Sequence, residues 1–104
     1  MNKKDFFEKV ENQIKYELFL DILLYLVLSK KKDEEIVARY PIKIGKQQGF
    51  STITAGEEKK RLRKRISDNW LTLKELEGIK KEFLKLDVEK FVERLKEEEK
   101  GLKQ

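Results

Sequence analysis

The segment with the clearest chemical character is residues 59–65, KKRLRKR, which place six cations in seven positions. On a helix these side chains spread around the outer face, while Leu62 and Ile66 point inward one turn apart. Cations so close together repel one another, so phosphates or acidic groups that neutralise them stabilise the helix. The pattern favours a surface that binds a polyanion. The alternative is a hydrated surface helix, because short Lys/Arg clusters are common.

All of the chain's excess positive charge lies in one segment. The 104 residues carry 25 Lys+Arg and 20 Asp+Glu. Residues 36–66 have a net charge of +7, and each flank has a net charge of −1. The cations of this segment, named here the nine central cations, are Arg39, Lys43, Lys46, Lys59, Lys60, Arg61, Arg63, Lys64 and Arg65. They predict nucleic acid, DNA or RNA, as the partner and an anionic membrane surface as the second choice.

Several kinds of chemistry are excluded by residues that the chain lacks. It has no cysteine and no histidine, which rules out thiol nucleophiles, disulfides, histidine general bases and zinc or haem sites built on these residues. No phosphate-binding glycine loop and no carboxylate cluster with metal-ligand spacing is present. We therefore expect a protein that is not an enzyme and has no cofactor and no metal. The lack of cysteine and of a signal-peptide pattern predicts a cytoplasmic protein.

Composition and the positions of glycine and proline predict the fold class. Charged residues make up 43% of the chain and hydrophobic residues 38%, which suits one domain, residues 1–104, with a modest core. Glycine and proline cluster between Pro41 and Gly56, so the centre is irregular or β-containing. We expect a mainly α, small helical domain of about four helices with a short central β-hairpin. The expected elements are a helix at 5–29, the hairpin region 36–54, a basic helix at 55–66, and helices at 73–86 and 88–100.

Capping patterns and alternation place the boundaries of these elements. Asp5, Thr54 and Thr72 each stand three residues before a glutamate, the spacing of a capping box, and Asp87 can cap the last helix. Alternation in residues 36–44 and the short run 50–54 predict two strands joined by a five-residue loop at 45–49. The alternative for the first strand is a short helix at 33–40 that ends before proline. The alternative at the C-terminus is one long helix through Asp87.

An apolar run at residues 18–28, LFLDILLYLVL, follows a polar first half of the same expected helix. It is shorter than the roughly 20 residues of a membrane-spanning helix. A helix that is apolar on all sides must be covered, so this half lies at the centre of the fold or packs against another copy. The expected interface residues are Leu20, Leu23, Leu24 and Val27.

Two residues within helices are open to two interpretations each. Asp21 interrupts the apolar run, and a carboxylate there must be paired or reach water. It either lies on a narrow wet stripe or makes a polar contact that sets the register of a partner helix. Trp70 follows the basic segment and is expected to anchor the core. The alternative is a platform on which a base stacks.

These observations lead to two functional hypotheses. The first is a small basic nucleic-acid-binding protein that contacts phosphates through residues 36–66 and self-associates through the first helix. The second is a protein-interaction module that docks on an acidic protein surface. Such a module would be a small subunit of a larger complex or an inhibitor encoded by a virus or mobile element. Attachment to a membrane surface is the least favoured interpretation.

Overall fold

The computed structural model describes residues 2–102, which form three helices and one antiparallel β-hairpin. In chain order the elements are α1 (Lys3–Leu28), β1 (Ile36–Ile44), β2 (Gln47–Thr54), α2 (Ala55–Lys85) and α3 (Val88–Leu102). The prediction of a mainly α chain with a central hairpin is confirmed. The expectation of about four helices is wrong within the described residues, because 55–66 and 73–86 belong to the single helix α2.

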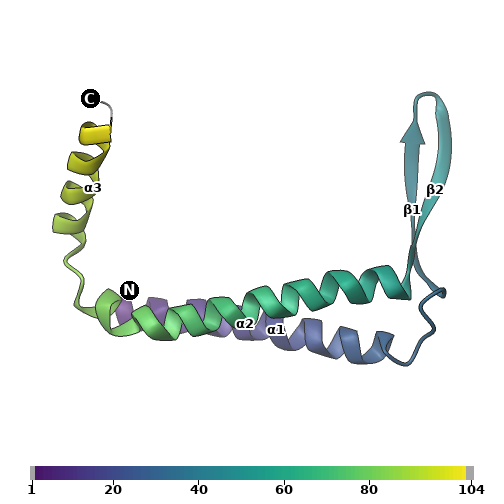
Figure 1. Ribbon diagram of the computed structural model, residues 1–104, viewed down its shortest axis with the longest axis horizontal. Coiled ribbons are helices and arrows are strands. Elements are labelled where there is room, and N and C mark those ends of the chain that lie inside the picture. The colour runs from purple at the N-terminus through teal and green to yellow at the C-terminus, as the bar shows by residue number, and fades with distance from the viewer. Residues whose placement is uncertain (1, 103–104) are drawn as a thin grey trace.

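The elements form an elongated, U-shaped molecule. Helices α1 and α2 lie antiparallel, side by side, and form the base of the U (Figure 1). The β-hairpin rises from one end of this pair and α3 from the other end, both toward the same side (Figure 1). The molecule measures 53 × 36 × 24 Å. The arrangement leaves α1 and α2 packed mainly on each other, and α3 packs on neither of them.

Helix α1 begins two residues earlier than predicted. The side chain of Asn2 accepts a hydrogen bond from the Asp5 amide at 2.8 Å and caps the helix. Asn is as good a cap as Asp, and with Asn2 in that role Asp5 lies in the first turn, where a carboxylate favours the helix dipole. The prediction that Asp5 caps the helix is therefore wrong.

Helix α2 begins as predicted but does not break. The Thr54 hydroxyl accepts a hydrogen bond from the Glu57 amide at 3.3 Å, which confirms the cap. The predicted cap at Thr72 is wrong, because this hydroxyl donates to the Asp68 carbonyl at 2.9 Å inside the helix. Ser, Asp and Asn at 67–69 are weak helix formers. Packing of α2 along α1 outweighs that preference.

The central segment is a hairpin with a tighter turn than predicted. Ile44 pairs with Gln47, which leaves Gly45 and Lys46 as a two-residue connection instead of a loop at 45–49. Gly45 has φ +62° and the following lysine does not have positive φ. Glycine at the first central position is what a type II′ hairpin turn requires. The alternative of a short helix at 33–40 is wrong, since residues 36–44 are strand.

The loop after α1 holds the base of this hairpin against α2. The amide of Ala55 donates to the Glu35 carbonyl at 2.7 Å, and the amide of Gly56 donates to the Asp33 carbonyl at 3.0 Å. These bonds satisfy two of the free amides at the start of α2. A Cβ on residue 56 would stand 3.1 Å from the Asp33 Cβ and 3.3 Å from its carbonyl oxygen. Glycine at this position permits the close approach of the loop.

The predicted break before the last helix is confirmed. Residue 86 is extended, and the Asp87 carboxylate accepts a hydrogen bond from the Lys90 amide at 3.2 Å. Helix α3 then leaves the helical pair (Figure 1). Its apolar residues Val88, Val92 and Leu95 are 42–53% exposed.

The core is a thin seam between α1 and α2. Its buried hydrophobic side chains, among the residues that the structure describes, are Phe7, Leu18, Leu28, Ala55, Leu62 and Leu73. At the N-terminal end of α1 the ring of Phe7 packs against Phe83, with 5.8 Å between ring centres. A single seam covers one side of each helix, so the second half of α1 does not lie at the centre of the fold.

Candidate nucleic-acid interface

The nine central cations divide into two groups when their partners are considered. Three of them form ion pairs with acids of the same chain: Lys59 with Asp33, Arg61 with Glu58, and Arg65 with Asp21. Within residues 2–102 the other six form no ion pair, and their side chains are exposed. These six, named here the free cations, are Arg39, Lys43, Lys46, Lys60, Arg63 and Lys64.

Lys59 is a structural residue. Its ammonium lies 2.6 Å from the Asp33 carboxylate, and its side chain is only 14% exposed. It also donates to the Lys31 carbonyl at 3.4 Å. The hydrogen bond and charge of Lys59 lower the pKa of Asp33, and the charge of Arg63 lowers it further. This cation fastens the loop after α1 to the start of α2 and is not available to a partner.

Arg61 is held by an acid on its own helix. Its Nε donates to Glu58 Oε2 at 3.1 Å, and a second guanidinium nitrogen contacts Oε1. This bidentate pair lowers the pKa of Glu58 and raises that of Arg61. Glu58, in the first turn of α2, therefore neutralises Arg61 within the chain.

Arg65 joins α2 to the acid inside the apolar half of α1. Its Nε lies 3.2 Å from Asp21 Oδ2, and the Asp21 side chain is 3% exposed. The contact lacks the alignment of a hydrogen bond, and within the described chain that oxygen has no other donor. The interpretation of Asp21 as a residue on a wet stripe is wrong. The polar contact exists, but it joins two helices of one chain.

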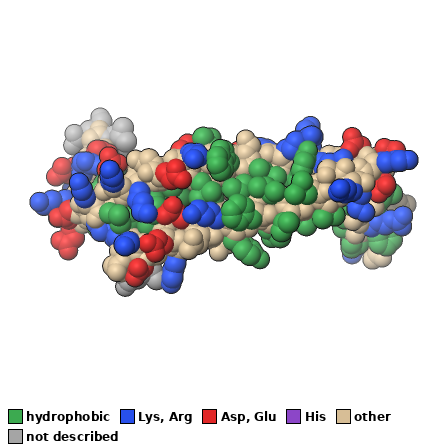
Figure 2. All heavy atoms as spheres, turned by 90° about the horizontal axis from the view of Figure 1, so that it is seen from below, with side chains coloured by type: hydrophobic (Ala, Val, Ile, Leu, Met, Phe, Trp, Pro, Cys, Tyr) green, Lys and Arg blue, Asp and Glu red, His purple; other side chains and the backbone are tan. Residues whose placement is uncertain are grey.

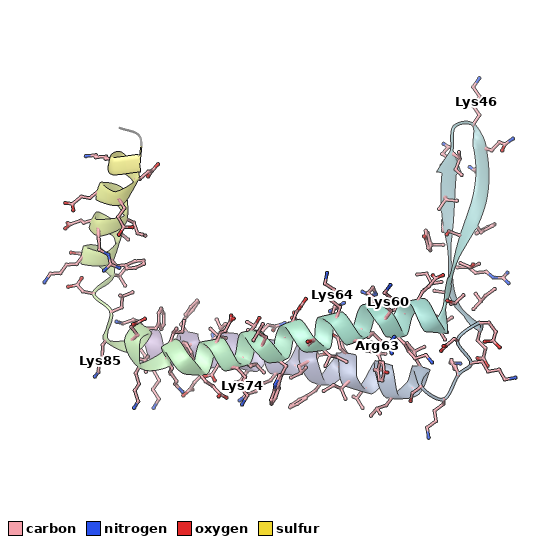
Figure 3. All side chains as sticks on the ribbon, viewed as in Figure 1. Lys46, Lys60, Arg63, Lys64, Lys74 and Lys85 are labelled. Atoms are coloured by element: carbon pink, nitrogen blue, oxygen red, sulfur yellow. The ribbon has the colours of Figure 1, made fainter. Side chains whose placement is uncertain are left out.

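The free cations of α2 are set by helical geometry. Lys60 and Lys64 are one turn apart and lie about half a turn around α2 from the buried Leu62. Both point from α2 toward the side on which the hairpin and α3 rise (Figure 3). Arg63 lies further round the helix, toward α1 (Figure 3). An outward face with two unpaired ammonium groups at one-turn spacing can follow consecutive phosphates.

The free cations of the hairpin stand away from the helices. Arg39 and Lys43 are four residues apart in β1, so they share one face of the hairpin. Lys46 occupies the turn, at the tip farthest from α2 (Figure 3). The concave side of the U is thus bounded by Lys60 and Lys64 at its base and by a basic arm at one end. A backbone carrying negative charge can contact both elements there.

Trp70 is not a core anchor, because 55% of its surface is exposed. The ammonium of Lys74 lies 4.7 Å from the centre of its ring, a cation–π contact. The ring forms one end of a shallow apolar groove whose other walls include Tyr25 and Leu26 of α1 and Arg63 of α2. The helical spacing of Trp70 from Leu62 and Leu73 places it beside the buried face of α2 and not on it. This spacing is the feature of the sequence that indicates its exposure.

The expected interface residues are exposed as one surface. Leu20, Leu23, Leu24 and Val27 are 42%, 61%, 44% and 59% exposed. Seen from the side opposite the hairpin and α3, apolar side chains gather along the middle of the molecule and toward its hairpin end (Figure 2). Charged side chains crowd the other end of this view (Figure 2). Lys60 and Lys64 point away from this view, toward the side on which the hairpin and α3 rise (Figure 3).

Comparison with protein-family models, with curated proteins and with solved structures finds no match for this chain. In the part of the chain that the structure describes, no group of three or more acidic side chains is placed to hold a metal ion. Among these same residues, no helix combines the length and hydropathy needed to cross a membrane.

Proposed function

We propose that this protein binds nucleic acid by contacting phosphates with the free cations of α2 and the hairpin. The observation that supports the proposal best is the outward pair Lys60 and Lys64, which form no ion pair within the described chain, beside a hairpin whose tip carries Lys46. The contacts are to the backbone, because ammonium groups bind phosphate oxygens as point charges without regard to sequence. We therefore expect similar affinity for different sequences of the same length.

The test is the salt dependence of binding to a short fluorescent duplex, followed by anisotropy. The variant Lys60→Gln/Arg63→Gln/Lys64→Gln removes the three free cations of α2. Each phosphate contact contributes about −0.9 to the slope of log K against log salt concentration. The slope of the triple variant should therefore be shallower by about 2.7, and its affinity at low salt should fall steeply.

A control with the same change in net charge separates a local site from a general attraction. Lys74→Gln/Lys81→Gln/Lys85→Gln removes three exposed lysines from the rest of α2. Lys74 and Lys85 lie along α2 away from Lys60 and Lys64 (Figure 3). This control should keep the wild-type slope. Equal losses in the two variants, or no binding by the wild type to DNA or RNA at low salt, would reject the proposal.

The exposed apolar surface favours a second candidate function, a protein-interaction module. In that case the free cations would dock on an acidic protein surface, and the apolar side chains of α1 would bind a separate part of the partner. The measurement that selects this candidate is purification of the chain with a bound protein and without nucleic acid at ordinary salt. The free cations would then be needed for that association.

A further inference from the structure

The second half of α1 exposes as many hydrophobic side chains as the described residues bury in the core. Within residues 19–27, six of the nine side chains are exposed and apolar: Phe19, Leu20, Leu23, Leu24, Leu26 and Val27. The described residues contain six buried hydrophobic side chains in all. Contiguous apolar surface of this kind marks an interaction site on a water-soluble chain.

Four exposed side chains on one face of α1 have the spacing of the seam of a helix pair. Tyr16, Leu20, Leu23 and Val27 follow one another at intervals of four, three and four residues, and are 65%, 42%, 61% and 59% exposed. They line the side of α1 opposite the buried Leu18. Alternation of three and four is the heptad spacing by which knobs of one helix enter holes of another. The partner that fits this stripe is therefore a helix with the same spacing.

The chain as a whole exposes more surface than a compact monomer of its mass. The molecule exposes 9057 Å², whereas a compact monomer of this mass exposes about 6,200 Å². Its radius of gyration is 21.2 Å, against about 13 Å for a compact domain of this length. A standard interface needs about 800 Å² from each partner. The excess exposure is several times that amount.

We propose that a second copy of the chain docks on this stripe, with the two α1 helices antiparallel and a two-fold axis between Leu20 and Leu23. Leu20 then packs against the partner's Leu23, and Tyr16 packs against the partner's Val27. Charge selects the orientation. A parallel pair places the two runs of lysine at 30–32 side by side. The antiparallel pair places Lys30 of each copy beside Gln13 and Glu17 of the other, and Glu17 supplies a negative charge.

The dimer has a defined geometry with respect to the free cations. Lys60 and Lys64 lie on the face of α2 turned away from α1, so the interface does not cover them. The two-fold axis places the two concave sides of the U on opposite sides of the dimer. If the proposed function holds, each dimer offers two phosphate-binding surfaces that face away from each other. The dimer itself does not depend on that function.

The first measurement is the mass of the purified protein by light scattering over the micromolar range. The wild type should have the mass of two chains. Leu23→Glu/Val27→Glu should have the mass of one chain, with a dissociation constant raised at least about a hundredfold, because the interface would bury two carboxylates against apolar side chains of the other copy. Its far-UV circular dichroism should be unchanged, since both side chains are already exposed in one chain.

A matched control keeps this result specific. Leu71 is 58% exposed and lies about half a turn around α2 from the buried Leu73, on the face away from α1. Leu71→Glu introduces one carboxylate at a similar exposure outside the interface, so this variant should retain the mass of two chains.

The second measurement tests the orientation. The chain has no cysteine, so Tyr16→Cys and Val27→Cys introduce single thiols. Under mild oxidation, a mixture of the two variants should form disulfide-linked pairs, and each variant alone should not. Crosslinking of each variant alone would establish a parallel pair and overturn the antiparallel arrangement.

Three other outcomes would overturn the proposal. They are a wild type that has the mass of one chain throughout, a glutamate variant that keeps the mass of two, and a control that becomes one chain. A one-chain protein that floats with phosphatidylcholine–phosphatidylserine vesicles would assign the stripe to a membrane surface. A one-chain protein that gains mass only with a different protein would assign it to that protein. The duplex-binding slope of the glutamate variant tests the proposed function separately.

Discussion

Asp21 and Arg65 offer the sharpest test of how α1 and α2 are joined. The carboxylate is 3% exposed inside an apolar half-helix, and the guanidinium that neutralises it is 46% exposed. The two residues therefore differ in what their loss leaves behind. Arg65→Gln leaves a buried negative charge without its ion-pair partner. Asp21→Asn leaves a cation that water already solvates in part.

The expected loss in the free energy of unfolding follows from this difference. Removing one partner of a fully buried ion pair costs about 3–5 kcal/mol. Solvent screens Arg65 in part, so we expect about 2 kcal/mol for Arg65→Gln. Asp21→Asn removes the charge and leaves a poorly bonded amide, at about 1 kcal/mol. The double variant should resemble Asp21→Asn, because once the carboxylate is neutral the loss of Arg65 matters little. The double variant is then more stable than Arg65→Gln alone.

The assay is urea unfolding followed by circular dichroism at one fixed protein concentration, because association would otherwise shift the midpoint. Arg61→Gln is the control. It also removes an arginine from α2, but the partner of this arginine, Glu58, lies one turn away on the same helix. It should cost less than about 1 kcal/mol. The reasoning is refuted if Arg65→Gln costs no more than this control, or if Asp21→Asn fails to rescue it.

Two further predictions concern substitutions of glycine and the stability of the fold at low pH. Gly78→Ala should raise the free energy of unfolding by about 0.5–1 kcal/mol in thermal melts, because a Cβ there meets no atom within 4 Å and alanine favours the helix. Gly56→Ala should gain less or lose stability, because its Cβ meets Asp33 at 3.1 Å; an equal gain at both sites would contradict the described loop contact. Folding lowers the pKa of Asp33 and of Glu58, so their contribution is present at neutral pH and is lost as the pH falls through the ordinary carboxyl range and below. The melting temperature should therefore decrease when the pH is lowered below about 4.5, and it should decrease less for the double variant Asp33→Asn/Glu58→Gln. An equal decrease in the double variant and the wild type would refute the assignment of this acid sensitivity to Asp33 and Glu58.

Local rules predicted the parts of the fold that depend on neighbouring residues. The cap at Thr54, the break at Asp87 and the alternation of residues 36–44 each involve atoms a few positions apart, and each is confirmed. The sequence left two alternatives for the apolar half of the first helix, a position at the centre of the fold or an exposed surface. The small amount of chain left to cover this half favoured exposure, which the structure shows for Leu20, Leu23, Leu24 and Val27.

Other features depended on contacts between distant residues. Thr72 has the spacing of a cap, yet it lies inside α2 because the helix gains more from packing along α1 than from a break. Trp70 is large and apolar, yet the single seam of the core does not extend round α2 far enough to cover it. The partner of Lys59 is 26 positions away in a loop, and no spacing rule connects the two residues.

The run of cations shows why a count of charges overstates what a partner meets. On a helix with 3.6 residues per turn, six cations in seven positions must point in nearly every direction. Lys59 and Arg65 border the face that packs on α1, where the loop and α1 supply Asp33 and Asp21. Lys60 and Lys64 point the opposite way, and neither forms an ion pair with an acid of the described chain. Packing of α2 on α1 thus assigns neighbouring lysines to opposite tasks, and only those turned away from α1 leave their charge available to a phosphate backbone.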